Sequence, residues 1–229
     1  DGRGVWLVED ETAAGRLLTE VDVPLFAEER VPLERELAAV VARTPGGETR
    51  AWPVVETVQR DGICVEVLAP APGIDPRQAA TAQEIALVVA AELGVVGVLA
   101  VELFARTDGA LVVNELAIRP HNSAHWTIEG ARTSQFEQHL RAVLDWPLGE
   151  TTPTAPATAM ANVLGGPDPD LARRLPAVLA ADPGARVHLY GKAPRPGRKL
   201  GHVTVVGDDP VEVRRRAVRA AALLRGDAP

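Results

Sequence analysis

The stretch VELFARTDGALVVNELAIRPHNSAH, which runs from Val101 to His125, contains two apolar runs joined by Asp108-Gly109. An Asp-Gly pair between two strand-like runs is the strongest short-range signal for a β-hairpin. If these two residues form the whole loop, the pairing register places Glu102 directly opposite Glu115. The stretch therefore predicts a sheet that carries two carboxylates side by side on one face.

Two carboxylates in a direct cross-strand pair repel each other, so they need a cation, a shared proton or bulk water. Mg²⁺ explains the pair, because this ion favours one or two carboxylates plus substrate phosphates over a complete cage of protein ligands. A solvated hairpin face, on which like charges diverge into water, is the alternative. A loop of three residues would shift the register by one and separate Glu102 from Glu115.

The loop after the second strand brings Arg119, His121 and Asn122 close together in sequence. The guanidinium group of Arg119 offers a planar fork for a carboxylate, a bicarbonate or a phosphate. His121 could exchange a proton near neutral pH, and Asn122 can both donate and accept hydrogen bonds. The alternative is a polar loop whose side chains cap the next helix, and we favour it for His125 and His139. Without a cysteine at ligand spacing, the cluster does not favour zinc.

Periodicity and turn residues predict the remaining elements. Strands are expected at Val5–Val8, Pro24–Arg30, Glu36–Arg43, Thr49–Val58, Gly62–Ala69, Val95–Arg106, Ala110–Leu116, Ala159–Leu164, Arg186–Tyr190 and Leu200–Val206. Helices are expected at Glu11–Glu20, Asp75–Leu93, Ser134–Trp146, Pro169–Ala181 and Pro210–Arg225. This mixture indicates an α+β or α/β fold, of which we favour α+β, and the Thr/Pro/Ala-rich segment Thr151–Thr158 suggests a linker or crossover between residues 1–150 and residues 151–229.

Composition and charge narrow the function classes. The formal net charge of −7 argues against nonspecific nucleic-acid binding, and no apolar run is long enough to span a membrane. The single cysteine, Cys64, excludes an internal disulfide framework and fits the reducing cytoplasm. The chain opens on DGRGVWLVED, without a methionine and partway through a glycine-rich turn, so we expect it to be part of a longer protein.

The segments NELAIRPHNSAHWT and TSQFEQHLRAVLDWPLG resemble the signature region of the N5-carboxyaminoimidazole ribonucleotide synthetases, ATP-grasp enzymes of purine biosynthesis. The resemblance extends from DGRGV to RPGRKLGHV. It implies an ATP-grasp domain at residues 1–150 that lacks its first strands, followed by a small β-rich C-terminal domain with helices at residues 151–229. ATP and Mg²⁺ are the implied cofactors. The implied protein is cytoplasmic and homodimeric, acts on small molecules, and binds neither nucleic acid nor membrane.

The resemblance also assigns roles to individual positions. The ATP-binding residues that it implies are Asp1, Gly2, Arg3, Gly4, Glu28, Glu29, Arg30, Val31, Glu36, Gln59, Asn114 and Glu115. The metal ligands are Glu102 and Glu115, and the catalytic residues are Arg119, His121 and Asn122. The substrate-binding residues are Arg119, His121, Asn122, Ser123, Lys192, Arg195 and Arg198. At position 59 the family leads us to expect a histidine, and glutamine replaces its titratable ring with an amide.

The segment YGKAPRPGRKLGH resembles the loop that grips the ribose phosphate of the substrate. The loop contains four cations, Lys192, Arg195, Arg198 and Lys199, which suit an anion. A solvated surface loop is the alternative. Lys192 and Arg198 are the first candidates for the phosphate, and Arg195 rivals Arg198 because this loop is shorter than in some relatives.

The implied reaction is an ATP-dependent carboxylation of 5-aminoimidazole ribonucleotide by bicarbonate, through carboxyphosphate, in purine synthesis. We expect Glu102 and Glu115 to hold the metal, Arg119 to supply fixed positive charge, and His121 to handle protons or orient bicarbonate. Two alternatives stay open. One is an ATP-grasp ligase with another acceptor, and the other is an inactive module for nucleotide binding or subunit interaction.

Overall fold

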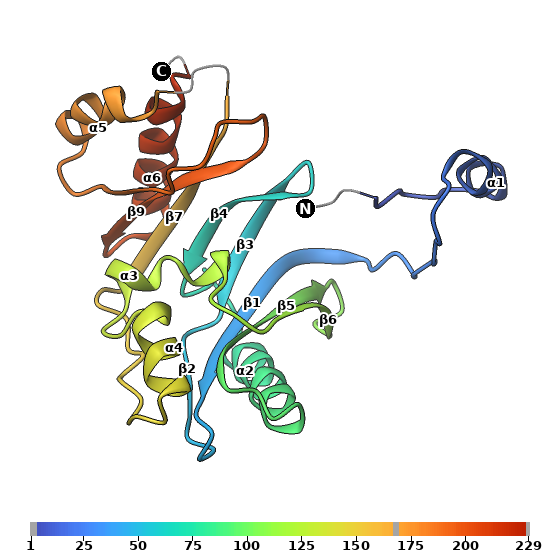
Figure 1. The fold of residues 1–229 in the computed structure, drawn as a ribbon, viewed down its shortest axis with the longest axis horizontal. Helices are drawn as coiled ribbons and strands as arrows, with labels where there is room; N and C mark the ends of the chain where they lie inside the picture. The colour runs from blue at the N-terminus through green and yellow to red at the C-terminus, as the bar shows by residue number, and fades with distance from the viewer. Residues whose placement is uncertain (1–3, 167–169, 228–229) are drawn as a thin grey trace.

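The computed structural model describes residues 4–166 and 170–227, in which the strands form one antiparallel sheet (Figure 1). The order along the sheet is β6-β5-β1-β3-β4-β7-β9-β8, and β2 pairs with β1 outside this path. The strands are β1 (Leu33–Arg43), β2 (Thr49–Ala51), β3 (Val55–Arg60), β4 (Ile63–Ala69), β5 (Gly97–Arg106), β6 (Leu111–Ala117), β7 (Ala157–Leu164), β8 (Arg186–Leu189) and β9 (Lys199–Gly207).

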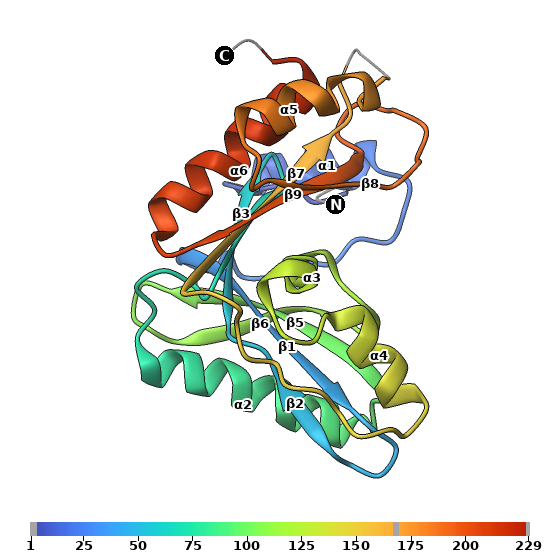
Figure 2. The ribbon, with the colours of Figure 1, turned by 90° about the vertical axis from the view of Figure 1, so that its left-hand side faces the viewer.

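Helices cover both faces of this sheet. The helices in the described residues are α1 (Glu11–Glu20), α2 (Pro76–Glu92), η1 (Asn122–Ala124), α3 (Thr127–Gly130), α4 (Gln135–Val143), η2 (Ala172–Arg174), α5 (Leu175–Ala181) and α6 (Pro210–Arg225). Helices α2 and α6 lie on one face, whereas α3 and α4 lie on the other (Figure 2). No helix in the described residues is both long enough and apolar enough to cross a bilayer.

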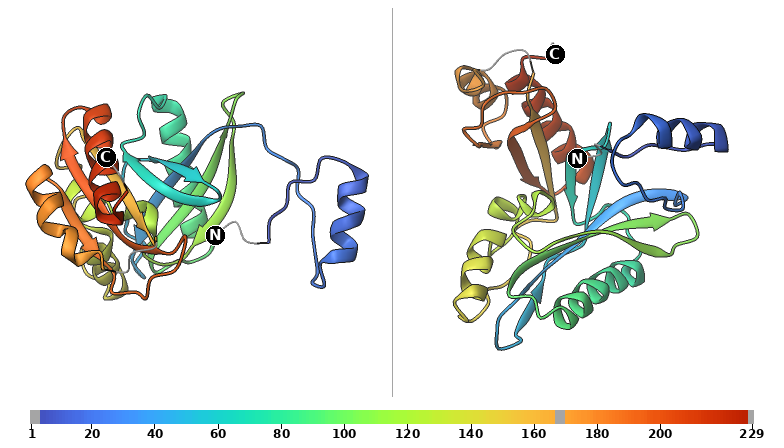
Figure 3. Two further views of the ribbon diagram at one scale, coloured as in Figure 1. Left: turned by 90° about the horizontal axis from the view of Figure 1, so that it is seen from above. Right: turned by 45° about the vertical axis from the view of Figure 1, so that its right-hand side comes forward.

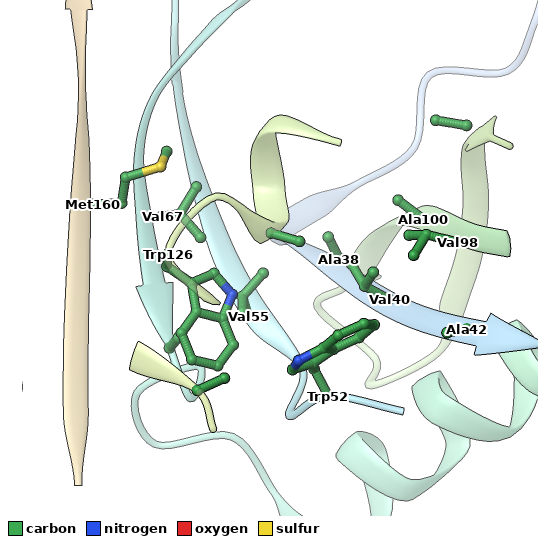
Figure 4. Packing of buried hydrophobic residues seen from close by; sticks show 14 of the residues in the cluster. Ala38, Val40, Ala42, Trp52, Val55, Val67, Val98, Ala100, Trp126 and Met160 are labelled. Carbon is green, nitrogen blue, oxygen red and sulfur yellow. The ribbon is translucent and has the colours of Figure 1, made fainter. Parts of the chain in front are cut away.

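The two faces follow from the alternation of side chains along each strand. Leu37 packs under α2 and pairs with Glu56, which pairs with Leu68 in the cluster under α6. Because directly paired residues point to the same face of a sheet, α2 and α6 cover the same face. On the opposite face, Trp52 and Trp126 pack among small residues beneath α3 and α4 (Figure 4). This second face carries the carboxylates of β1, β5 and β6 that are described below.

The expectation of an α+β fold is confirmed, and the sheet crosses the predicted domain boundary. Strand β7, in the second part, pairs with β4 in the first part from Glu66↔Ala161 to Ala69↔Thr158. Backbone hydrogen bonds thus join the two parts into one sheet. The division between residues 150 and 151 stays a prediction.

Two of the predicted strands are wrong. The segments Val5–Val8 and Pro24–Arg30 contain no strand, and α1 between them buries no residue. Figure 3 shows this arm standing away from the sheet, so its extended backbone finds no neighbouring strand to share hydrogen bonds with. Large side chains in the arm remain exposed, Leu7 to 69% and Phe26 to 84%.

Other predictions needed smaller corrections. The expected strand Thr49–Val58 is broken at Trp52-Pro53, because proline cannot donate a ladder hydrogen bond. Helices α1 and α6 have the predicted bounds, and the Asp75 side chain caps α2 as expected. Part of the expected helix Pro169–Ala181 lies outside the described residues, and the rest forms η2 and α5.

Candidate active site

The hairpin of β5 and β6 places Glu102 directly opposite Glu115, as predicted, but by a different route. The loop has three residues rather than two, since the Arg106 N–H donates to the Ala110 carbonyl at 2.9 Å. That loop shifts the register by one residue near the turn. A β-bulge at Asn114 then shifts the register back before it reaches the two glutamates. The predicted pair is confirmed, and the predicted two-residue loop is wrong.

The bulge also decides which face Glu115 occupies. Near the turn, Leu111 packs into the cluster under α2, whereas Ala117 at the far end packs into the opposite cluster with Ala100. In an unbroken strand these two positions would share one face, because they are an even number of residues apart. The extra residue reverses the alternation between them. It thereby puts Glu115 on the same face as Glu102.

Three carboxylates gather on this face, on β1, β5 and β6. Burial raises the pKa of Glu102, and the charges of Glu115 and Glu36 raise it further, while Lys199 lowers it. Burial also raises the pKa of Glu36, partly offset by a hydrogen bond from Gln59. The like charges therefore crowd one another and would be relieved by a cation.

The composition of this cluster fits Mg²⁺ bound together with phosphates. Within residues 4–166 and 170–227 there is no group of three or more His, Cys, Asp or Glu side chains able to hold a metal. Glu102 and Glu115 offer two hard oxygen ligands, and Mg²⁺ completes its shell with water and phosphate oxygens. The assignment of both residues as metal ligands stays a prediction.

His121 stands next to the carboxylates. Its Nε2 lies 3.6 Å from Glu102 Oε1, and its Nδ1 lies 2.9 Å from Ser123 Oγ. Burial lowers the pKa of His121 to about 4, and the positive charges of Arg119 and Lys199 contribute. The ring is therefore neutral at pH 7, which favours orienting bicarbonate over carrying a positive charge, and the catalytic role of His121 stays a prediction. Ser123 is buried behind the ring, which its hydroxyl helps to orient.

Asn122 belongs to a hydrogen-bond network that sequence reasoning missed. Its Nδ2 donates to Asn162 Oδ1 at 2.9 Å, and Asn162 Nδ2 donates back to Asn122 Oδ1 at 2.8 Å. Asn162 Nδ2 also donates to the Cys64 carbonyl at 2.9 Å, and Lys199 Nζ donates to Asn122 Oδ1 at 3.1 Å. The network ties the loop after β6 to β4, β7 and β9.

The network restricts what Asn122 can offer a ligand. Its carbonyl oxygen already accepts two hydrogen bonds, from Asn162 and Lys199. One N–H of its amide is committed to Asn162, which leaves the other N–H to donate. A ligand at this point therefore meets a donor beside a lysine, as a carboxylate, bicarbonate or phosphate oxygen requires.

Neither partner of Asn122 was assigned to this site from the sequence. Lys199 was noticed only as one of four cations in its loop, and burial lowers its pKa while the nearby Glu102 raises it. Asn162 sits in an apolar strand with 1% of its surface exposed. A polar side chain in a buried strand was the available signal, since such a residue must find hydrogen-bond partners.

The remaining predicted residues lie outside this cluster, some on the sheet and some in the N-terminal arm. Gln59 lies on β3, and its Nε2 donates to Thr57 Oγ1 at 3.4 Å. Arg119 is exposed and donates to the carbonyl of the adjacent Pro120. Asn114 is exposed at the bulge. The ATP-binding candidates outside helices and strands are Gly4, Glu28, Glu29, Arg30 and Val31. Asp1, Gly2 and Arg3 lie outside the described residues.

The cationic loop follows β8 at the other end of the sheet. Lys192 is exposed, with its Nζ 4.8 Å from the centre of the Tyr190 ring. Arg195 is exposed as well, whereas Arg198 is half-buried and donates to the Ala193 carbonyl at 3.1 Å. The structure thus brings Glu36, Glu102, Glu115, His121 and Lys199 together, and the other three cations lie on the loop that leads to Lys199.

Two family models match the chain. The ATP-grasp domain matches residues 1–136, and the phosphoribosylaminoimidazole carboxylase C-terminal domain matches residues 158–216. An N5-carboxyaminoimidazole ribonucleotide synthase from Mycobacterium leprae is 58% identical over 96% of this chain and 54% of its own length. One from Corynebacterium ammoniagenes is 50% identical over 98% of this chain and 56% of its own length. The chain spans about half the length of the curated relatives it matches.

Solved structures give the same result. The carboxyaminoimidazole ribonucleotide synthase from Aspergillus clavatus, complexed with ATP, is 36% identical with a TM-score of 0.85, over 99% of this chain and 60% of that chain. The N5-carboxyaminoimidazole ribonucleotide synthetase from Thermus thermophilus is 41% identical with a TM-score of 0.82, over 96% of this chain and 59% of that chain.

Proposed function

Because this chain belongs to the ATP-grasp family and matches N5-carboxyaminoimidazole ribonucleotide synthases over nearly its whole length, we propose that the protein carrying it is such an enzyme. It carboxylates the exocyclic amine of 5-aminoimidazole ribonucleotide with bicarbonate and ATP. The product is N5-carboxyaminoimidazole ribonucleotide, on the de novo route to purines.

One observation carries this proposal: the opposed pair Glu102 and Glu115, with His121 and the Lys199–Asn122 donors next to it. Two crowded carboxylates suit a divalent cation that accompanies ATP. Donors and a lysine beside them suit a second anion, such as bicarbonate. A site that receives both can bring a nucleophilic oxygen to a phosphate.

The chemistry has two steps. An oxygen of bicarbonate forms a bond to the γ-phosphorus of ATP while the bond to the β-phosphate oxygen breaks, which gives carboxyphosphate and ADP. The exocyclic amine then forms a bond to the carboxyl carbon, inorganic phosphate leaves, and the amine loses a proton. Carboxyphosphate reacts readily with water, so the site must also shield it.

Each residue of the site has a definite task in this proposal. Mg²⁺, when held by Glu102 and Glu115, supplies positive charge to the transferring phosphate. Asn122 and Lys199 donate to the oxygens of bicarbonate and of carboxyphosphate, and Arg119 adds fixed positive charge. His121 is neutral at pH 7, so it orients bicarbonate by hydrogen bonding rather than by exchanging a proton.

The substrate is held from both ends of the face. Glu36 receives the ribose of ATP, and the segment from Glu28 to Val31 receives the adenine through backbone groups. The cations Lys192 and Arg198 hold the phosphate of the aminoimidazole ribonucleotide. The resemblance supports these assignments. So do the positions of Glu36 at the carboxylate end of the sheet and of the loop at the opposite end.

The test is ADP formation by the full protein with ATP, Mg²⁺ and bicarbonate, with and without aminoimidazole ribonucleotide. We expect ADP formation to require bicarbonate and to match the incorporation of labelled bicarbonate into product. Glu102→Gln should lower ADP formation about 100-fold, whereas Glu84→Gln, an exposed change on α2, should not lower it. Turnover that ignores the ribonucleotide would instead indicate another acceptor. Nucleotide binding without any turnover would indicate an inactive module.

We propose a cytoplasmic homodimer as the working form of the full protein. Cys64 is the single cysteine of this chain, and the lack of a disulfide framework in these residues supports a reducing compartment. The dimer rests on the family resemblance. Light scattering on the full protein tests it, and a mass of one chain at micromolar concentration contradicts it.

A further inference from the structure

A cluster of rings lies behind the cationic loop, on the same face as the carboxylates. Tyr190 Oη and His202 Nδ1 share a hydrogen bond of 2.7 Å. The His202 ring stacks on His188 with centroids 4.6 Å apart, and the His125 ring lies 5.3 Å from it. The function proposed above uses none of these rings.

His202 is the fixed member of the cluster. It lies on β9 between Asn162 of β7 and His188 of β8, and it pairs directly with both. His188 is itself held by Glu129, whose Oε1 lies 2.7 Å from His188 Nε2. His202 is 1% exposed, so its ring is enclosed between its neighbours on β7 and β8.

Tyr190 connects the His202 ring to the exposed side chain of Lys192 on the loop. Its N–H donates to the Leu200 carbonyl at 2.8 Å, and its hydroxyl meets His202, so both ends of the residue are anchored. Its ring lies beneath the ammonium group of Lys192, with Nζ 4.8 Å from the ring centre. An ammonium group over an aromatic face at this distance is attracted by the ring.

Lys192 needs such support because of where it stands. It follows Gly191, whose φ of +64° is a left-handed conformation that glycine adopts freely, and it is exposed on a loop rich in proline and glycine. A free lysine side chain loses considerable rotamer entropy when it binds a ligand. A ring that already holds the ammonium group reduces that loss.

We propose that Tyr190, anchored by His202, is a positioning residue that holds the Lys192 ammonium group ready for the phosphate of the substrate nucleotide. This inference rests on the proposed function, in which Lys192 binds that phosphate. It divides Tyr190 into two parts with separate tasks. The ring face holds the lysine, and the hydroxyl holds the ring.

The charges of the cluster agree with this arrangement. Burial lowers the pKa of His202 to about 3, so its ring is neutral at pH 7 and does not repel Lys192. Burial also raises the pKa of Tyr190, so the phenol keeps its proton. The positive charge near the ring therefore belongs to the loop and is available to an anion.

The first test observes the contact itself. Lys192 and Lys199 are the two lysines of this chain, and reductive methylation with ¹³C gives an NMR signal for each accessible lysine of the full protein. Lys192→Arg assigns the signal of Lys192. We expect that signal to be shifted upfield by the Tyr190 ring, and to return to the ordinary position in Tyr190→Leu but not in Tyr190→Phe. An unshifted Lys192 signal in the parent protein overturns the proposal, whatever the activity.

The second test measures the consequence by calorimetry. The probes are aminoimidazole ribonucleotide and the corresponding ribonucleoside, which lacks the phosphate. We expect Tyr190→Leu to raise the Kd of the ribonucleotide about fivefold and to leave that of the ribonucleoside unchanged. Tyr190→Phe keeps the ring and should raise the ribonucleotide Kd less. An equal effect on both probes indicates a merely structural role, and no effect on either excludes positioning, so both overturn the proposal.

A control separates this inference from the proposed function. Lys192→Ala should remove most of the preference for the ribonucleotide over the ribonucleoside, whether or not the protein turns over. If the parent protein binds the ribonucleotide with this preference but forms no ADP, the proposed reaction fails while the positioning of Lys192 is supported. If Lys192→Ala leaves the preference intact, Lys192 does not bind the phosphate and the positioning proposal fails.

Discussion

The two ends of the site face are built in different ways. At one end, Glu36, Glu102 and Glu115 stand on β1, β5 and β6, where backbone pairing fixes each position. At the other end, Lys192 and Arg195 stand on an exposed loop, and a ring contact supports one of them. The carboxylates are held against their mutual repulsion, whereas the cations are left free to reach a ligand.

This difference teaches where rigidity is needed. Groups that repel each other stay together only when the backbone leaves them no alternative, and a strand pair in a nine-stranded sheet does so. Groups that must close on an incoming anion gain from a loop, as long as a neighbour limits the entropy that they lose. The following predictions test this contrast, from the largest expected effect to the smallest.

Insertion of one alanine between Asn114 and Glu115 should have the largest effect, because the single bulge then places the alanine opposite Glu102. Glu115 would then turn toward the α2 face, and Mg²⁺-dependent ADP formation should fall by more than about 100-fold. Insertion of one glycine after Asp108 is the matched control, since it lengthens the three-residue loop without altering the strands beyond it. Comparable activity in the two insertion variants would show that the pairing register does not position Glu115.

Glu102→Gln should separate activity from stability. ADP formation should fall about 100-fold, because one of two metal ligands loses its charge. Burial and the other carboxylates raise the pKa of Glu102 in the folded state, so ionisation at pH 7 opposes folding. The free energy of unfolding without ligand should therefore rise by about 0.5 kcal/mol in the variant.

Urea unfolding at several pH values tests the sign. The parent should gain stability as the pH falls from the raised folded-state pKa of Glu102 toward its ordinary value of 4.5. Glu102→Gln should lack that part of the gain. Equal dependence on pH in both proteins would contradict the crowding of charges.

At the cationic end, Arg198→Ala should raise the Kd of aminoimidazole ribonucleotide more than Arg195→Ala does, about tenfold against about twofold. Arg198 is half-buried and adjoins Lys199, whereas Arg195 is exposed. Calorimetry on both variants decides between the two rivals. A larger effect from Arg195→Ala would show that Arg195, rather than Arg198, binds the phosphate.

His202→Asn should change the activity at neutral pH least of all, by the few-fold expected from loss of the Tyr190 anchor. Its main effect should be on the free energy of unfolding at acid pH. The ordinary pKa of His202 is 6.5 and burial lowers it to about 3. Below pH 6.5, His202 therefore takes up a proton in the unfolded state but stays neutral in the folded state. The free energy of unfolding falls as the pH drops through this range. Between pH 6 and pH 4, the free energy of unfolding of the variant should fall by about 1.4 kcal/mol less per pH unit than that of the parent.

The free energy of unfolding, measured by urea titration across that range, checks this slope. His139→Asn is the control, because His139 accepts a hydrogen bond from the Val98 N–H at another place in the sheet. An unchanged slope in His202→Asn would mean that His202 is protonated in the folded protein.

Sequence reasoning predicted the local elements well wherever one short stretch holds the whole signal. Asp75 and the proline after it set the start of α2, and the bounds of α6 were predicted to the residue. The facing pair Glu102 and Glu115 also came from local pattern, although the three-residue loop, which had been the alternative, and an unforeseen bulge cancelled each other. That prediction was right in its result and wrong in its derivation.

Features that depend on distant partners were not accessible in this way. The arm at residues 4–32 has strand-like segments but no neighbour to pair with, and Asn162 reaches Asn122 only because β7 joins the sheet beside β4. The neutral state of His121 likewise depends on what buries it.

The sequence alone determined which groups the protein owns and which elements carry them, since turns, caps and alternation are properties of neighbouring residues. Tertiary structure alone decided that Glu115 shares a face with Glu102, that Asn122 can only donate, and that Lys192 rests on Tyr190. The physical reason is that register, burial and hydrogen-bond capacity are set by the partners of a residue. Those partners come from strands and loops far apart in the chain.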